Sequence, residues 1–377
     1  MTQVIKKHDK VEEFDFNKIE SALERATERA GKKYNPKVSA HVKEVVLDNI
    51  KNKDTISVQE LHTVIEYALK DIDEDVYVEY IKYNNYKHRF PFAFNSMLQE
   101  GKRVVFSGDK ENANKNSALN STQKEILGGL VSEQIMLNYE LKPEIAQAHL
   151  DNWIYIHDLR DRFLFNINCC LFDLASVLKG GFTLNGIEIE EADTLEVAFD
   201  QTNDIIMCAS SQQFGGFTIP NIDETMGVYV EKSYKRLKTT NEYSEDEIDD
   251  ILYKSLVKKV RMLEYKINCV NNALGQTPFV TWTFGLGTDR FSRMVTKAIL
   301  DVRINKLGKK KDIAIFPKLV FLHRQDINGE KGSPNYDLKL QAIKCSMETM
   351  YPDYLSLDEG YLKEVYDRCG IAISPMG

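Results

Sequence analysis

Two adjacent cysteines, Cys169 and Cys170, follow Asn168 in the apolar stretch NINCCLFDL. Neighbouring side chains of a β-strand point to opposite faces, so at most one of the two thiols can face a ligand site. A free cysteine is more often a small, buried, apolar residue than a reactive one. A thiol that does face a closed cavity can donate hydrogen or exchange electrons without a depressed pKa. The pair therefore predicts one packing residue and one candidate for redox chemistry.

His157 and Asp158 end a second apolar stretch, WIYIHDL, which predicts a strand. Ligand contacts in α/β proteins gather at the carboxyl ends of strands, so these two side chains could reach a site there. A single histidine in such a place is also commonly structural. From the residues alone, both interpretations of His157 stay open.

Two stretches with the composition of loops offer further polar side chains. The stretch ENANKNSALNST at 111–122 contains Asn112 and Asn114, and the stretch SSQQFGG at 210–216 contains Ser210 and Ser211. Amide and hydroxyl groups of this kind can hydrogen-bond a sugar or a phosphate, and adjacent glycines let a backbone approach closely. Plain connecting loops are the alternative interpretation.

The sequence contains no P-loop, HExxH or GxSxG motif. The stretch GLGTDR at 285–290 follows an apolar segment, but Arg290 stands where a GxGxxG rhythm requires its third glycine, so we expect a strand-to-helix turn. The six cysteines are scattered without a CxxC pair. They predict neither a disulfide framework nor a zinc ribbon, and we assign no metal ligands.

The first ninety residues have the pattern of a small module with its own basic side chains. The stretch VIKKHDKVEEFDF predicts a hairpin, Asp15 can cap a helix, and Ser57 with Glu60 forms a capping box before another helix. If the basic side chains of these elements converge, they form a polyphosphate site; a solvated charged surface is the alternative. The basic side chains in question are Lys6, Lys7, His8, Lys18, His62, Lys82, Lys87, His88 and Arg89.

Beyond Pro91 the chain alternates apolar strands, such as PFVTWTFG and IAIFPKLVFL, with helices. This alternation predicts an α/β fold with a largely parallel sheet, and leaves a barrel and an open sheet equally possible. The C-terminal stretch RCGIAISPMG predicts one more buried strand. We therefore expect a helical module with a β-cap at 1–91 and an α/β domain at 92–377.

Charge and hydropathy exclude some classes of partner. The formal net charge of -8 argues against a general affinity for nucleic acid. No apolar run approaches the roughly 20 residues that cross a bilayer, and the N-terminal residues lack a signal-peptide pattern. We expect a cytoplasmic protein without a membrane or nucleic-acid partner.

Three stretches of the first module resemble the ATP-cone domain: VIKKHDKVEEFDFNKIESALERA, ISVQELHTVIEYAL and VYVEYIKYNNYKHRF. That family is a four-helix module under a small β-cap, and it binds ATP or dATP as an allosteric signal. The resemblance implies that Lys7 and Lys18 contact phosphates, that His62 lies near the nucleotide, and that Lys87 is a further candidate. ATP cones occur in a transcriptional repressor with a preceding zinc ribbon, which this sequence lacks, and in ribonucleotide reductases.

Seven further motifs extend the resemblance over the chain. They occur in the order ENAN, ELKPEIAQAHLDNWIYIHDL, NCCLFDL, SSQQFGGFTIPNID, GQTPFVTWTFGLGT, AIFPKLVF and MYPDYL…ISPMG. With the cone, they resemble the anaerobic, glycyl-radical (class III) ribonucleoside-triphosphate reductases, which make deoxyribonucleotides for DNA replication. The resemblance implies a ten-stranded α/β barrel of two five-stranded halves, of which this chain would hold the first.

The resemblance also implies radical chemistry on ribonucleoside triphosphates. In the family, a cysteine thiyl radical on a finger loop abstracts the ribose 3′-hydrogen, and the 2′-hydroxyl leaves as water. A C-terminal glycine stores the radical, which a radical-SAM activase generates, while formate or a thiol system is the reductant. ATP or dATP acts as an allosteric effector, and the enzyme is expected to be a homodimer.

Several residues acquire roles when the family motifs are carried over by position. Cys169 corresponds to the second active-site cysteine, and Cys170 to a packing position. His157 corresponds to the HD of the family motif, which implies a substrate or proton-network contact. The remaining residues assigned to the substrate pocket are Asn112, Asn114, Asn168, Ser210 and Ser211.

The family's PMG motif is followed by the radical cysteine, whereas Gly377 is the last residue here. We therefore expect the finger loop, the second half-barrel, the glycyl-radical segment and a four-cysteine zinc site in a separate C-terminal reductase fragment. Our first hypothesis is the N-terminal part of a split or interrupted reductase, inactive by itself. The alternative is a non-catalytic regulator of a reductase that binds ATP or dATP.

Overall fold

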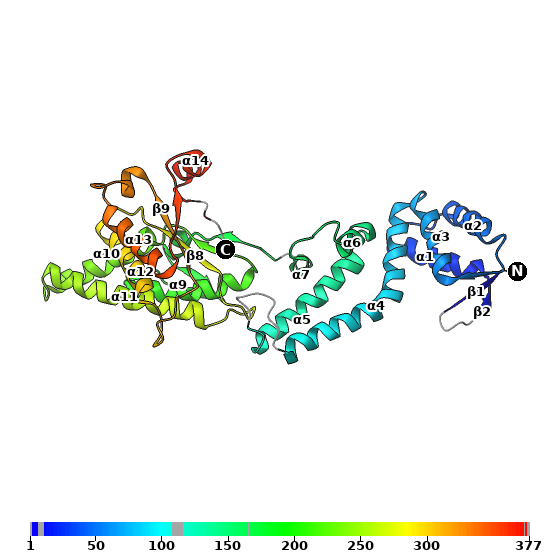
Figure 1. Ribbon diagram of the computed structural model, residues 1–377, viewed down its shortest axis with the longest axis horizontal. Helices are drawn as coiled ribbons and strands as arrows, with labels where there is room; N and C mark the ends of the chain where they lie inside the picture. The colour runs from blue at the N-terminus through cyan, green and yellow to red at the C-terminus, as the bar shows by residue number, and fades with distance from the viewer. Residues whose placement is uncertain (1, 7–10, 108–115, 165, 373, 375–377) are drawn as a thin grey trace. The chain divides into compact units, whose positions relative to one another are not determined.

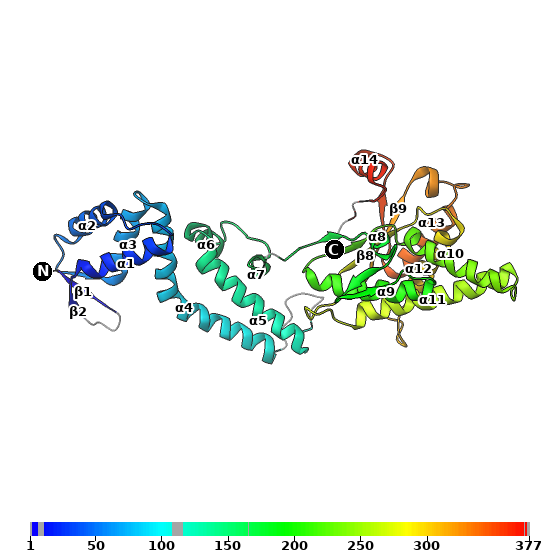
Figure 2. The same cartoon turned by 180° about the vertical axis from the view of Figure 1, so that it is seen from behind.

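The computed structural model describes residues 2–6, 11–107, 116–164, 166–372 and 374, with the backbone alone described for 85–96 and 104–107. The chain divides into two compact units (Figure 1; seen from behind in Figure 2). The first comprises Met1–Ser107 and Ile126–Leu164, and the second comprises Gly108–Glu125 and Phe165–Gly377.

The first unit begins with a three-stranded sheet beside a group of helices. Its strands lie in the order β2-β1-β3, with β1 antiparallel to β2 and parallel to β3. The strands are β1 (Gln3–Ile5), β2 (Val11–Glu13) and β3 (Thr55–Ser57), and the helices are α1 (Phe16–Arg29), α2 (Pro36–Ile50), α3 (Val58–Lys70) and α4 (Glu74–Ser107). Asp15 accepts the Asn17 N–H and caps α1, as predicted. The apolar faces of the four helices share one core, which includes Leu23, Val42, Val46, Leu69 and Val76.

The helix α4 runs through residue 91, where the sequence predicted a domain boundary. It is followed by α5 (Asn120–Ile135), the π-helical turn η2 (Met136–Glu140), α6 (Pro143–Leu150) and α7 (Leu159–Arg162). The strand predicted at 153–157 is wrong, because this stretch consists of turns and irregular backbone. Asn152 and Asp158 bracket it with positive φ angles, a conformation that breaks an extended chain.

The second unit is built on a five-stranded, fully parallel sheet in the order β10-β9-β8-β7-β4. Its strands are β4 (Cys170–Leu171), β7 (Phe217–Ile219), β8 (Val280–Phe284), β9 (Lys318–His323) and β10 (Asp353–Ser356). Parallel neighbours require crossover connections, and helices supply them here. The longer helices are α9 (Leu195–Ala209), α10 (Ile222–Thr240), α11 (Glu245–Cys269), α12 (Arg290–Asn305), α13 (Tyr336–Thr349) and α14 (Gly360–Cys369). The predicted parallel α/β domain is confirmed.

Shorter elements complete this unit. They are α8 (Leu174–Leu178), the hairpin of β5 (Phe182–Leu184) and β6 (Ile187–Ile189), the 3-10 turn η3 (Ser210–Gln212), and the π-helical turn η4 (Gln325–Gly329). Across the part of the chain that the structure describes, no helix is both long and apolar enough to span a bilayer.

The two faces of the parallel sheet carry different side chains. One face belongs to the main hydrophobic core beneath α9 to α13 and includes Phe217, Trp282 and Phe321. The other face, which we call the threonine face, carries Thr218 of β7 and Thr281 and Thr283 of β8. Thr218 and Thr281 are direct neighbours across β7 and β8, and both are fully buried. Their hydroxyl groups have no hydrogen-bond partner among the described atoms, so this part of the face is buried and polar, whereas Val320 and Leu322 of β9 make the neighbouring part apolar.

The last described residues do not form the strand that the sequence predicted, since Ile371, Ala372 and Ser374 lie outside any strand and residue 373 lies outside the described residues. Gly370 ends α14 with a positive φ, and its carbonyl accepts the side-chain N–H of Asn221. Ala372 then packs in a small core with Val320 and Leu322 of β9.

Candidate functional site

The adjacent cysteines lie on opposite faces of the parallel sheet. Cys170 begins β4, pairs in register with Phe217, and packs against the main core. Its thiol donates a hydrogen bond to Gln213 Oε1 at 2.9 Å, and burial raises the pKa of the Cys170 thiol. Cys169 precedes it and therefore points toward the threonine face. The structure thus assigns packing to Cys170 and leaves Cys169 available for chemistry.

The Cys169 thiol makes two hydrogen bonds, one as acceptor and one as donor. Its Sγ accepts the backbone N–H of Gly216 at 3.1 Å, and its S–H donates to Asn168 Oδ1 at 3.2 Å. Gly215 lies directly against this pair, because its N–H donates to the Asn168 carbonyl at 2.7 Å. A backbone amide and a side-chain amide thus fix the orientation of the thiol.

Ser210 and Ser211, which the sequence assigned to the substrate pocket, bond to a neighbouring loop. The side-chain N–H of Asn272 donates to the Ser210 carbonyl at 3.0 Å. Ser211 Oγ accepts the Ala273 N–H at 3.0 Å and donates to the Met207 carbonyl at 2.6 Å. Ser211 also lines a cavity of about 630 Å³ next to the β5–β6 hairpin. The Ser210 carbonyl and the Ser211 hydroxyl therefore join the turn after α9 to the loop at 271–276.

The other predicted substrate residues lie outside the described residues of the second unit. His157 belongs to the first unit and Cys169 to the second. The His157 side chain is 73% exposed and pairs with Asp158 in the turn before α7, so it does not end a strand. Asn112 and Asn114 lie outside the described residues.

The GLG stretch forms a turn whose backbone donors are already used. The side chain of Asp223, in the first turn of α10, accepts the N–H of Gly285 at 2.8 Å and the N–H of Gly287 at 3.4 Å. Thr296 Oγ1 donates to the same carboxylate oxygen at 3.0 Å. Burial raises the pKa of Asp223, and these donors oppose that rise. The stretch is the strand-to-helix turn that the sequence predicted, fixed by an acid that sequence reasoning missed.

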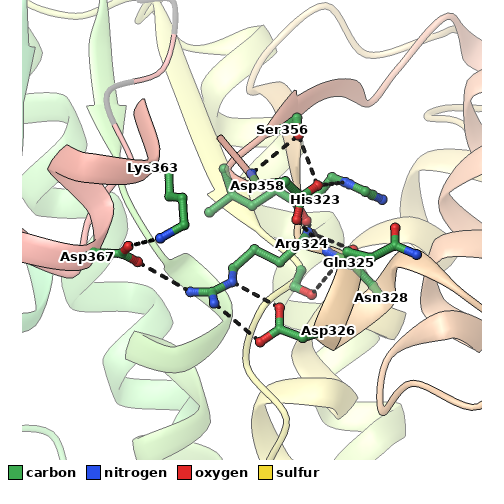
Figure 3. A network of polar contacts seen from close by, with 11 residues as sticks. His323, Arg324, Gln325, Asp326, Asn328, Ser356, Asp358, Lys363 and Asp367 are labelled. Carbon is green, nitrogen blue, oxygen red and sulfur yellow. Dashed lines mark hydrogen bonds and ion pairs between the residues drawn. The ribbon is translucent and has the colours of Figure 1, made fainter. Parts of the chain in front are cut away.

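A polar network lies at the carboxyl ends of β9 and β10 (Figure 3). His323 Nδ1 lies 2.9 Å from Asp358 Oδ2, and the Gln325 N–H donates to Asp358 Oδ1 at 2.6 Å. Arg324 lies between Asp326, at 3.1 Å, and Asp367 of α14, at 3.6 Å. These pairs connect α14 to the strand β9. The sequence offered no signal for the network, because its members come from three separate segments.

The basic residues of the first module line a small cavity between the sheet and α1 and α3. Lys6, Glu12 and Lys18 are among its lining residues, and Glu12 bonds both lysines. The two ammonium groups lower the pKa of Glu12 to about 2. His62 also lines the cavity, and its Nδ1 lies 2.8 Å from Tyr80 Oη. Lys18 and His62 are therefore brought together, while Lys7 and the Lys87 side chain lie outside the described residues.

Within the described residues, no group of three or more His, Cys, Asp or Glu side chains could hold a metal ion. Two family models match the chain. A model described as anaerobic ribonucleoside-triphosphate reductase matches residues 111–376, and a model of the ATP cone domain matches residues 2–89. The chain belongs to the anaerobic ribonucleoside-triphosphate reductase family.

Curated members of this reductase family are similar over much of the chain. The anaerobic ribonucleoside-triphosphate reductase of Escherichia coli (strain K12) is 34% identical over 375 residues, which cover 97% of this chain and 52% of that protein. The enzyme of that name from Haemophilus influenzae is 38% identical over 274 residues, covering 71% of this chain and 38% of that protein. The chain therefore spans about half the length of the first relative.

A solved structure shares the fold. The anaerobic ribonucleotide reductase from Thermotoga maritima with glycerol in the active site has a TM-score of 0.52 at 15% identity, covering 77% of this chain and 53% of that chain. Both the resemblance and the fold class, an ATP cone followed by a parallel α/β domain, are confirmed. The Lys18 and His62 cavity falls in the range of the ATP cone match, and Cys169 falls in the range of the reductase match.

Proposed function

We propose that this chain is the N-terminal portion of an enzyme that reduces ribonucleoside triphosphates to deoxyribonucleoside triphosphates anaerobically. The observation that carries the proposal is the Cys169 thiol, held on the threonine face of the sheet by Gly216 and Asn168. Neither partner, a backbone N–H and an amide oxygen, can take up the thiol proton. The site therefore suits hydrogen or electron transfer better than nucleophilic catalysis.

The reduction replaces the ribose 2′-hydroxyl, which leaves as water, by hydrogen. Its two electrons come from formate, which becomes carbon dioxide, or from thiols, which become a disulfide. We assign Cys169 to this redox step and Asn168 to the substrate pocket, where we also place His157, Asn112 and Asn114. Ser210 and Ser211 would act there through the loop that they support.

The threonine face would line the interior of a ten-stranded barrel once a second five-stranded half covers it. A buried polar face suits a ribose because hydroxyl groups can donate and accept hydrogen bonds. We assign the second half, the glycyl radical and the zinc site to a C-terminal reductase fragment, with a radical-SAM activase and a homodimeric assembly. A closed interior of this kind would keep water from a radical intermediate.

We propose residues 1–91 as the allosteric domain, which binds ATP or dATP in the cavity of Lys18 and His62. The support is the convergence of these side chains from α1 and α3 on one cavity within the ATP cone match. Lys7 and Lys87 are further phosphate contacts in this proposal.

The test combines the full chain with a candidate C-terminal fragment, the activase and formate or a dithiol under anaerobic conditions, and measures deoxyribonucleotide formation. We expect turnover with the wild type and Cys170→Ala, and none above background with Cys169→Ala. If the two chains associate and ATP binds without any turnover, the chain is the non-catalytic regulator instead.

A further inference from the structure

The two lysines of the cone cavity are already paired with a carboxylate from the same cavity. Glu12 Oε2 lies 2.6 Å from Lys6 Nζ and 2.7 Å from Lys18 Nζ, so one oxygen atom bridges both ammonium groups. Lys6 directly follows β1, Glu12 is the middle residue of β2, and Lys18 lies in the first turn of α1. The bridge thus joins three elements around the cavity.

The bridge occupies the position that suits a phosphate group. Two converging ammonium groups are a charge-assisted binding site for an anion, and the carboxylate satisfies that site while no other anion is bound. The cavity measures about 150 Å³. Ligand sites commonly measure roughly 300–1,000 Å³, so a nucleotide requires this cavity to open.

The charge of the cavity also indicates that the cavity must change before a nucleotide binds. Glu13 and Asp15 line it together with Glu12, so three carboxylates face the two lysines among the described lining residues. Among these lining residues, an incoming polyphosphate therefore meets a net negative charge while Glu12 stays in place, and no net charge once Glu12 has moved away. Movement of Glu12 would release both lysines at once, because they share the same carboxylate oxygen.

We propose that Glu12 is an internal competitor of the nucleotide phosphates, which must leave Lys6 and Lys18 before ATP or dATP binds. The inference rests on the proposed effector function of the cone. A triphosphate carries several negative charges against one on Glu12, so it can displace the carboxylate, and exposed ion pairs are weak enough for the exchange to be reversible. Glu12 thereby raises the nucleotide concentration at which the cone responds.

The test measures ATP binding to the full chain by titration calorimetry. Glu12→Gln removes the competing charge and keeps the shape, so we expect ATP to bind about three- to tenfold more tightly, a range set by the loss of two exposed ion pairs. Adenosine, which has no phosphate, should gain nothing. Glu28→Gln is the matched control, because Glu28 is an exposed glutamate of α1 that does not line the cavity; its ATP affinity should stay within about twofold.

Thermal unfolding reports whether each variant folds. If Glu12→Gln does not fold, Glu12→Asp replaces it, because the shorter side chain cannot bridge both lysines and should also tighten ATP binding. Equal affinity for ATP overturns the inference, and weaker binding shows instead that Glu12 contacts the nucleotide.

If the cone is not an effector site at all, the titrations give a different result from equal ATP affinities. If folded wild type and folded Glu12→Gln both fail to bind ATP and dATP, the proposed function of the cone and this inference are both wrong. Binding by the variant alone supports the inference, because the competing carboxylate then excludes the nucleotide from the wild type.

Discussion

Gly215 lies so close to the Cys169 site that a Cβ on it would stand 2.1 Å from Asn168 Oδ1 and 2.6 Å from Cys169 Sγ. The same Cβ would stand 2.5 Å from the Asn168 backbone oxygen, so a side-chain rotation alone cannot relieve the contact. The close pairing of β4 with the end of the 213–216 loop therefore requires a glycine at this position.

We expect Gly215→Ala to lower the free energy of unfolding by about 1–3 kcal/mol, because the segment carrying Cys169 must shift to admit the methyl group. Urea unfolding measures the loss, and turnover with the C-terminal fragment should fall as well. Gly128→Ala in α5 is the control, since its Cβ would have nothing within 4 Å and should stabilise the helix slightly. Unchanged stability and turnover for Gly215→Ala would show that the close packing is unnecessary.

The two adjacent thiols should differ in their reactivity toward iodoacetamide. Burial raises the pKa of Cys170, which lowers its thiolate fraction near pH 8, and the thiolate is the reacting form. We expect Cys169 to be alkylated on the order of tenfold faster, and the Cys170 rate to rise more steeply as the pH increases. Mass spectrometry of Cys169→Ala and Cys170→Ala separates the two rates, with exposed Cys369 as an internal reference. Equal rates would place both thiols in the same environment.

Arg303 of α12 and Glu264 of α11 form an ion pair with both side chains fully buried. The guanidinium reaches Glu264 Oε1 at 2.9 and 3.1 Å, and it also donates to the carbonyl of Pro317 at 2.7 Å, just before β9. Arg303→Met should cost about 3–5 kcal/mol of unfolding free energy, because it leaves the carboxylate buried without its partner.

Adding Glu264→Leu to Arg303→Met should recover most of this loss in urea unfolding, since no buried charge then remains. The exposed pair Lys254–Asp250 on α11 provides the control, and Lys254→Ala should change stability by less than about 0.5 kcal/mol. A double variant as unstable as the single one would point to lost packing around Pro317 instead of an unpaired charge.

The buried Tyr80 should make the first unit sensitive to alkaline pH. Burial raises the pKa of Tyr80 far above the usual tyrosine value of about 10, so the folded state keeps a proton that the unfolded chain releases. Stability from this group is complete below pH 10 and falls as the pH rises above it. We expect the wild type to lose stability between pH 10 and 11 more steeply than Tyr80→Phe, as measured by urea unfolding at each pH.

Tyr80→Phe removes the hydrogen bond with His62, so its stability at pH 8 should be lower by about 1 kcal/mol. The titration of Tyr80 is reported only by how much more steeply the unfolding free energy of the wild type falls above pH 10 than that of Tyr80→Phe. Parallel slopes for the two proteins would mean that the Tyr80 hydroxyl ionises as readily in the folded state as in the unfolded chain.

Local signals in the sequence predicted local structure well. Asp15 caps α1 as predicted, and the alternating stretch from Phe279 to Phe284 contains β8. The predicted capping box of Ser57 and Glu60 forms only one of its two hydrogen bonds. Ser57 accepts the Glu60 N–H, but the Glu60 carboxylate pairs with Lys53. A cation close in space competed successfully for that side chain.

The candidate site depended on pairings that residue types do not specify. Strand alternation predicted that one thiol of Cys169 and Cys170 would face away from the core, and the structure places Cys170 in the core. The contact of Cys169 with Gly216 spans 47 positions and exists only because β4 pairs with β7. Asp223 was missed for the same reason, since its partners Gly285 and Gly287 become neighbours only when β7 and β8 align.

The strand β4 lies at one edge of the sheet, and this position affects how a complete site around Cys169 could be assembled. Within the part of the chain that the structure describes, β4 has a single neighbour, β7, and Cys169 stands immediately before its first residue. A further strand that pairs with the unpaired edge of β4 would therefore lie next to Cys169 without separating any strands that are already joined. Docking along this border would extend the sheet and bring a reaction partner to the thiol in the same movement.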